Sequence, residues 1–97
     1  MTKLYYVHVG CPVCETGAIG VRRCADGFNL VLMCDECESV WASPDRTEVA
    51  DVLEAELPSF VVRSLDVAVA GGLAGWATEE EIERKGWTAN IEGVQDA

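Results

Sequence analysis

Two Cys-x-x-Cys pairs hold the residues of this sequence that are best suited to chemistry. Cys11 and Cys14 form the first pair, and Cys34 and Cys37 form the second, with residues 15–33 between them. That separation falls within the window of about 15–20 residues that is typical of four-cysteine zinc sites. Two thiolates three residues apart on a tight turn can reach one ion, and four sulfurs complete a tetrahedral shell. The spacing therefore predicts one metal ion held by four cysteines.

The chain between the two pairs has the pattern of a β-hairpin. Apolar and β-branched residues predict strands over 18–24 and 28–34, joined by the loop 25–27, which contains Asp-Gly. Asp-Gly is favoured in tight turns because it tolerates positive φ angles. The turn lies between the two pairs, where a hairpin that brings them together should have its tip. Further strands are expected over 4–9 and, more briefly, 40–42.

Over about residues 5–42 the sequence resembles a zinc ribbon. The residues that carry the resemblance are C11-P-V-C14, C34-D-E-C37 and the strand, Asp-Gly turn and strand between them. In zinc ribbons each cysteine pair sits on a rubredoxin-like zinc knuckle. The resemblance implies a single structural Zn²⁺ whose ligands are Cys11, Cys14, Cys34 and Cys37.

The two knuckle sequences depart from the zinc-ribbon pattern at one position each. Zinc knuckles often carry glycine directly after the second cysteine, whereas this chain has Glu15 and Glu38 there, and Gly17 comes two residues later. Four thiolates leave no open coordination position, so we expect a structural and not a catalytic ion. Zinc binding is worth about 10–16 kcal/mol in zinc-finger peptides, enough to decide whether so small a domain folds.

Other interpretations of the cysteines and of His8 stand beside this one. The same four sulfurs would hold iron in a rubredoxin-like electron carrier. A dithiol oxidoreductase places one Cys-x-x-Cys pair at the start of a helix, which a hairpin does not resemble. The fifth cysteine, Cys24, is expected to be a small buried apolar residue. His8 lies three residues before Cys11 and is expected to be an ordinary strand residue, because four cysteines already complete the shell.

After residue 42 the pattern becomes helical. Ser43 can cap a helix and Pro44 suits its first position, and apolar residues then recur at helical spacing until Pro58. We therefore expect a first helix that ends before Pro58. Short strands are expected over 60–62 and 65–70.

A second helix is predicted near the C-terminus. Thr78 and Glu81 have the spacing of a capping box, in which each side chain binds a backbone N–H of the other residue. Gly86 is suited to the left-handed position that ends a helix, with Trp87 packing on Ile82. Together the elements predict an α+β fold, in which an N-terminal zinc-ribbon hairpin or three-stranded antiparallel sheet precedes two C-terminal helices.

The chain is strongly acidic, with 7 basic and 17 acidic residues and a net charge of −10. Most of the negative charge lies in residues 47–97. We expect one small domain over 1–97, with a zinc-ribbon subregion over 1–42 and an acidic helical or mixed subregion over 43–97. A surface this negative is short of the Lys and Arg that bind phosphate, so direct nucleic-acid binding is not expected. Its field attracts basic partners.

The longest apolar run and the N-terminal residues bear on the cellular location of the protein. The longest apolar run, residues 67–77, is shorter than the roughly 20 residues that span a bilayer. The N-terminal residues lack the pattern of a secretory signal, so we expect a cytoplasmic protein that is not bound to membranes. In that reducing compartment, spaced cysteines more often bind metal than form disulfides.

These observations favour a non-enzymatic, zinc-stabilised protein-interaction module. The expected role is that of an adaptor, or of an inhibitor resembling immunity proteins or antitoxins, bound to a basic protein surface. The alternatives are the iron electron carrier and a nucleic-acid-associated zinc ribbon. The sequence has one histidine and none of the common nucleophile, phosphate-loop or zinc-protease motifs, so no catalytic residues are expected.

Overall fold

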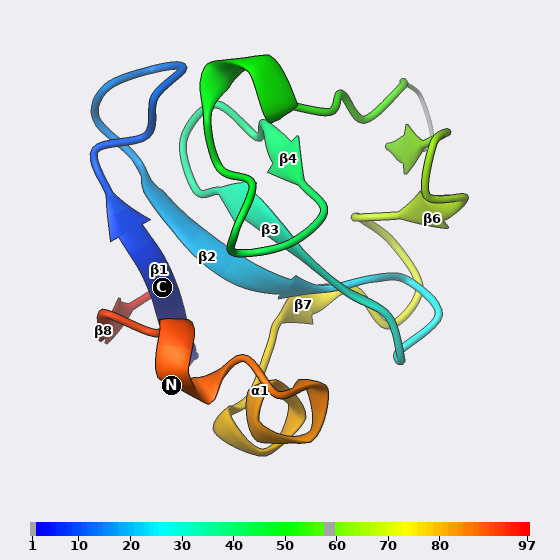
Figure 1. Ribbon diagram of the computed structural model, residues 1–97. Coiled ribbons are helices and arrows are strands. Elements are labelled where there is room, and N and C mark those ends of the chain that lie inside the picture. The colour runs from blue at the N-terminus through cyan, green and yellow to red at the C-terminus, as the bar shows by residue number, and fades with distance from the viewer. Residues whose placement is uncertain (1, 58–59) are drawn as a thin grey trace.

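An antiparallel β-sheet dominates the computed structural model, which describes residues 2–57 and 60–97 (Figure 1). In these residues the sheet has six strands. Five lie side by side in the order β4-β3-β2-β1-β8, and the sixth, β7, pairs with the C-terminal end of β2. The strands are β1 (Lys3–Val9), β2 (Ala18–Arg23), β3 (Leu30–Cys34), β4 (Val40–Trp41), β7 (Gly75–Trp76) and β8 (Gly93–Asp96). The predicted strands over 4–9, 18–24, 28–34 and 40–42 are therefore confirmed within one or two residues.

The β2–β3 hairpin forms as the Asp-Gly turn predicts. Cys24 donates its backbone N–H to the Asn29 carbonyl at 2.8 Å, and Gly27 has a φ of 74°. The Asp26 carboxylate accepts from the backbone N–H groups of Phe28 and Asn29 at 2.8 and 2.9 Å. The Asp26 side chain thus satisfies the backbone donors of the turn. The hairpin then brings the second cysteine pair back beside the first.

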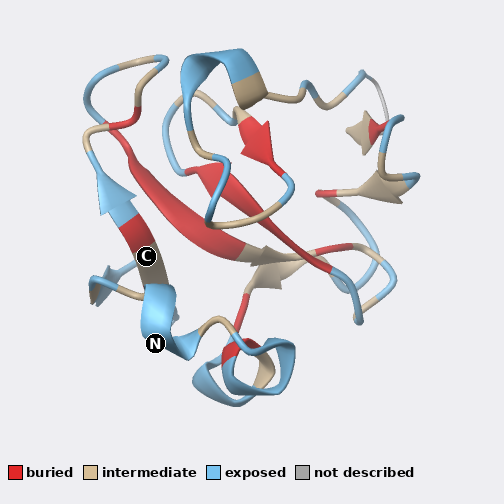
Figure 2. Ribbon diagram, in the orientation of Figure 1, coloured by how far each residue is buried: buried red, intermediate tan, exposed pale blue. Residues whose placement is uncertain are grey.

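The core lies on both faces of β3, whose residues are all buried (Figure 2). Successive side chains of a strand point to opposite faces, so Leu30, Leu32 and Cys34 lie on one side while Val31 and Met33 lie on the other. The first side belongs to a cluster that also contains Trp41 and two of the cysteines. The members of this cluster, here called the knuckle-side core, are Val7, Cys11, Ile19, Val21, Leu30, Leu32, Cys34, Trp41, Ala77 and Ile82.

A second cluster covers the opposite side of β3. Its buried members, here called the far-side core, are Cys24, Val31, Met33, Val40, Val62 and Val69. A small two-stranded sheet, β5 (Val61–Val62) and β6 (Val67–Ala68), supplies part of its cover. The strands expected over 60–62 and 65–70 are thus present in shortened form.

The helix expected between Ser43 and Pro58 does not form, so that prediction is wrong. The segment contains only a single 3₁₀ turn, η1 (Val49–Asp51), which buries none of its residues. Beyond η1 the chain is extended, and Leu53 exchanges two backbone hydrogen bonds with Val40 of β4 at 2.6 and 3.1 Å. Pairing with the open edge of β4 outweighs the helical spacing, because local propensity is weak against tertiary contacts.

The second predicted helix is confirmed as α1 (Glu79–Lys85). Glu81 donates its N–H to Thr78 Oγ1 at 3.2 Å, and Thr78 donates its N–H to the Glu81 carboxylate at 2.9 Å, which completes the capping box. At the other end, Gly86 has a φ of 84° and Trp87 donates to the Ile82 carbonyl. An ion pair of 2.8 Å between Arg23 and Glu81 attaches the helix to β2.

The expected fold class is therefore corrected. The α+β arrangement with two C-terminal helices is wrong: in residues 2–57 and 60–97 the fold is mostly β, with one α-helix and the 3₁₀ turns η1 and η2 (Thr88–Asn90). The subregion from residue 43 onward is largely extended, not helical. The expectation of one domain over 1–97 stays a prediction. In that same described part, no helix is long and apolar enough to cross a bilayer.

Removing the cap of α1 tests its contribution. Thr78→Ala leaves the Glu81 N–H without its side-chain acceptor, so the free energy of unfolding should fall by about 1 kcal/mol in chemical denaturation. Thr88→Ala removes the same atoms from an exposed threonine that makes no cap and should change it by less than about 0.5 kcal/mol. Equal losses in the two variants would show that the capping box does not stabilise the fold.

Candidate metal centre

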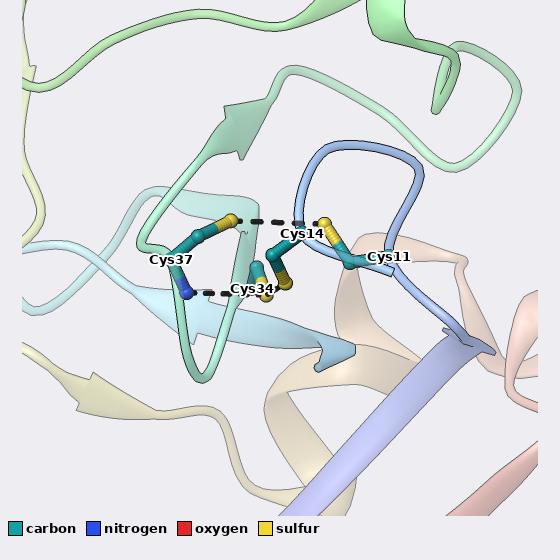
Figure 3. A group of neighbouring side chains, drawn as sticks. All are labelled: Cys11, Cys14, Cys34 and Cys37. Carbon is teal, nitrogen blue, oxygen red and sulfur yellow. Dashed lines mark hydrogen bonds between the residues drawn. The ribbon is translucent and has the colours of Figure 1, made fainter. Parts of the chain in front are cut away.

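Four cysteine sulfurs meet between the two knuckles (Figure 3). The Sγ atoms of Cys11, Cys14, Cys34 and Cys37 all lie within 4.8 Å of one another. Two sulfur–sulfur contacts join the knuckles: Cys11 to Cys37 at 3.7 Å and Cys14 to Cys34 at 3.6 Å. A tetrahedron with metal–sulfur distances of about 2.3 Å has edges of about 3.8 Å. The predicted ligands are therefore brought to metal-binding distance, and all five cysteines of the chain are free thiols.

The first knuckle is closed by backbone hydrogen bonds to β2's start. Gly10 and Cys11 both donate to the Gly17 carbonyl, at 3.1 and 2.9 Å, and Glu15 donates to the Cys11 carbonyl at 2.7 Å. These bonds turn the chain back directly after β1, so that Cys11 points inward. These three hydrogen bonds define the shape of the knuckle loop.

The second knuckle is locked to β2 through Asp35. Its carboxylate accepts from the Ala18 N–H at 2.9 Å, and its own N–H donates to the Ala18 carbonyl at 3.0 Å. The Cys34 N–H donates to the Ser39 carbonyl at 2.9 Å. Thr16 of the first knuckle also donates its hydroxyl to the Glu36 carboxylate of the second. The acidic pair between the second pair of cysteines therefore has a structural role that the sequence analysis missed.

Backbone N–H groups point at the sulfurs in both knuckles. Val13 donates to Cys11 Sγ at 3.4 Å, and Gly17 donates to Cys14 Sγ at 3.4 Å. In the second knuckle the donors to Cys34 Sγ are Glu36 at 3.4 Å and Cys37 at 3.5 Å. Hydrogen bonds to the charged form of a group favour that form, so these contacts favour thiolates.

The two glutamates that replace the usual knuckle glycines take the backbone conformation of glycine. Glu15 has a φ of 67° and Glu38 a φ of 61°, both in the left-handed region that a non-glycine residue adopts at a cost. The knuckle geometry therefore persists despite the departure from the zinc-ribbon pattern. Gly17 has a different role: a Cβ at this position would collide with Cys34 Sγ and lie 3.0 Å from the Asp35 carboxylate. Its position three residues after Cys14 is the available signal in the sequence.

Burial divides the four sulfurs into two kinds. Cys11 and Cys34 are completely buried members of the knuckle-side core, whereas Cys14 and Cys37 are partly exposed. Burial raises the pKa of Cys34 to about 12 and also raises the pKa of Cys11. The backbone N–H groups of Thr16 and Gly17 lower the pKa of Cys14 to about 6. The buried thiols favour the neutral form, so a cation beside them would be needed to hold them as thiolates.

The donor set fits a soft metal ion. Four cysteine sulfurs are the ligands of structural zinc sites and of iron–sulfur sites, and the group can hold one metal ion. An ion there would join the two knuckles and contribute its binding energy to folding.

Cys24 and His8 lie outside this group of sulfurs. Cys24 is completely buried in the far-side core, and burial raises the pKa of its thiol to about 11. His8 lies exposed on β1. Trp41 is completely buried, and its indole N–H donates to the Glu48 carbonyl at 2.9 Å.

Comparison with known proteins adds one relative of unknown role. No protein-family model matches this chain, and no solved structure matches it. The chain is 27% identical over 90 residues to uncharacterized protein L48 of Acanthamoeba polyphaga mimivirus, an alignment that covers 88% of this chain and 75% of the viral protein.

Two cysteine variants test the ligand assignment. Cys34→Ser should lose the metal and unfold at least residues 5–42, since four-thiolate binding is worth about 10–16 kcal/mol in zinc-finger peptides. Cys24→Ser, at an equally buried position, should keep the metal and lose only about 1–3 kcal/mol of stability. Elemental analysis, circular dichroism and limited proteolysis measure both. A metal-free Cys24→Ser protein, or a stable Cys34→Ser protein that keeps its metal, would contradict the assignment.

A glycine variant tests the packing around Cys34. Gly17→Ala places a methyl group against Cys34 Sγ, so one ligand must move and the affinity for Zn²⁺ should fall by about tenfold or more. Competition with a chromophoric chelator measures the affinity. Unchanged affinity would mean that the sulfur moves aside freely.

Proposed function

We propose that this chain is a zinc ribbon with one structural Zn²⁺ and that it acts as a non-enzymatic protein-interaction module. The observation that carries the metal proposal is the convergence of four sulfurs within 4.8 Å from two knuckles. Zn²⁺ is proposed in preference to iron because closed four-cysteine sites in small domains are typical of a redox-inert structural ion that contributes to folding.

The absence of an enzymatic role is part of the proposal. Four thiolates complete the coordination shell, which leaves no position for water or substrate on the ion. An ion held in this way stabilises and orients the knuckles, and it takes no part in bond making. The surface around the knuckles would then provide the function.

The proposed partner is a basic protein surface. The chain carries a net charge of −10, and four thiolates with one dication would make it −12. On α1 the carboxylates of Glu79, Glu80 and Glu83 are exposed. Such a field speeds encounter with basic partners and opposes the approach of phosphate backbones. An adaptor or an inhibitor that covers a basic surface fits this charge, and we place it in the cytoplasm.

Metal content per chain tests the proposal. Protein purified without added metal or chelator should contain one zinc per chain by elemental analysis and show no visible absorption. One iron with thiolate-to-iron absorption would instead support the rubredoxin-like electron carrier. A metal-free protein with oxidised cysteines would refute the zinc ribbon. The Cys34→Ser protein, prepared in parallel, controls for metal bound elsewhere.

A further inference from the structure

A groove of about 290 Å³ lies beside the second knuckle. We call it the knuckle groove, and the lining residues that matter here are Cys37, Glu38, Leu53, Glu54, Leu57 and Phe60. The second knuckle forms one wall. The other is the extended segment that pairs with β4 through Leu53, and the chain then continues toward β5. Figure 1 shows this segment running from η1 past β4 toward the small sheet.

The floor of the groove is apolar. Leu53 and Phe60 are partly buried against the far-side core, so their inner surfaces are fixed by packing while part of each still faces outward. Leu57 is 75% exposed, although it is a large apolar side chain. Leu53, Leu57 and Phe60 thus form a small apolar patch that could take one apolar side chain.

The walls of the groove are anionic. Glu38 and Glu54 are exposed, and they line the groove together with Cys37. Among the described residues that line the groove there is no Lys or Arg. The charge complementary to this surface is therefore positive.

The backbone at Glu38 has a counterpart in the first knuckle. A glycine would adopt the φ of 61° at Glu38 without cost, yet a glutamate stands there. Glu15 has the same strained conformation in the first knuckle but does not line the groove, so it supplies a matched control.

We infer that the knuckle groove is the docking site for a basic protein segment in which Arg or Lys flanks one apolar side chain. The cationic groups pair with Glu38 and Glu54, while the apolar side chain packs on Leu53, Leu57 and Phe60. This inference rests on the proposed function and names where the basic partner binds. A nucleic acid does not fit, because it offers phosphates to an anionic wall.

Two short peptides test the groove on the zinc-loaded full-length protein. The probes are acetylated and amidated Ala-Arg-Leu-Arg-Ala and Ala-Arg-Ser-Arg-Ala, titrated into ¹⁵N-labelled protein at low ionic strength. Amide shifts should concentrate at residues 37–39 and 53–57. The leucine peptide should bind about threefold more tightly or better, because its side chain buries apolar surface on the groove floor.

Charge variants at matched positions separate the groove from the general field. Glu38→Gln should weaken binding of the leucine peptide about threefold, whereas Glu15→Gln, with the same change of charge, should leave it nearly unchanged. Glu38→Gly and Glu15→Gly should both raise thermal stability, because each relieves a strained backbone. Only Glu38→Gly should also weaken binding.

The outcomes distinguish the two proposals. Shifts centred on α1, equal effects of Glu38→Gln and Glu15→Gln, or no preference for leucine would overturn the groove and leave the basic partner standing. No binding of either peptide anywhere on the protein would overturn the basic partner as well. Neither result bears on the zinc site, which metal analysis tests separately.

Discussion

The burial of two clustered cysteine sulfurs in the hydrophobic core is the constraint on which the rest of this structure depends. Cys11 and Cys34 are completely buried members of the knuckle-side core, packed with Trp41 and with Ile82 of α1. Burial raises the pKa of both thiols, so a cation among the four sulfurs would favour their thiolate form. Two of the four sulfurs that could hold an ion are therefore part of the hydrophobic core.

Features encoded within a few residues could be predicted from the sequence, and features that depend on distant pairing could not. The four cysteines and the hairpin between them follow from local spacing and turn chemistry, and α1 follows from the caps at Thr78 and Gly86. The helical spacing of segment 43–57 is overridden by a distant contact, because Leu53 pairs with the edge of β4. β8 pairs with β1, which lies at the opposite end of the chain, and the four residues of β8 show no pattern that predicts this pairing.

The knuckles show how far a sequence can depart from a pattern while its geometry is kept. Glu15 and Glu38 occupy a conformation that glycine would adopt freely, and hydrogen bonds from the surrounding backbone hold them there. Gly17 differs from these two residues. Its lack of a side chain is what matters, because this leaves room for Cys34 Sγ, whereas its torsion angles do not require glycine. Asp35, between the cysteines of the second pair, joins that knuckle to β2. Residues other than the four cysteines therefore shape both knuckles.

The four sulfurs are unequally buried, so the group can be reached from solvent on one side. Cys14 and Cys37 are partly exposed, whereas Cys11 and Cys34 are sealed behind Trp41 and the sheet. A chelator or thiol would therefore reach Cys14 and Cys37 before it reached the buried pair, and an ion held by the four sulfurs would be open to ligand exchange from that exposed side.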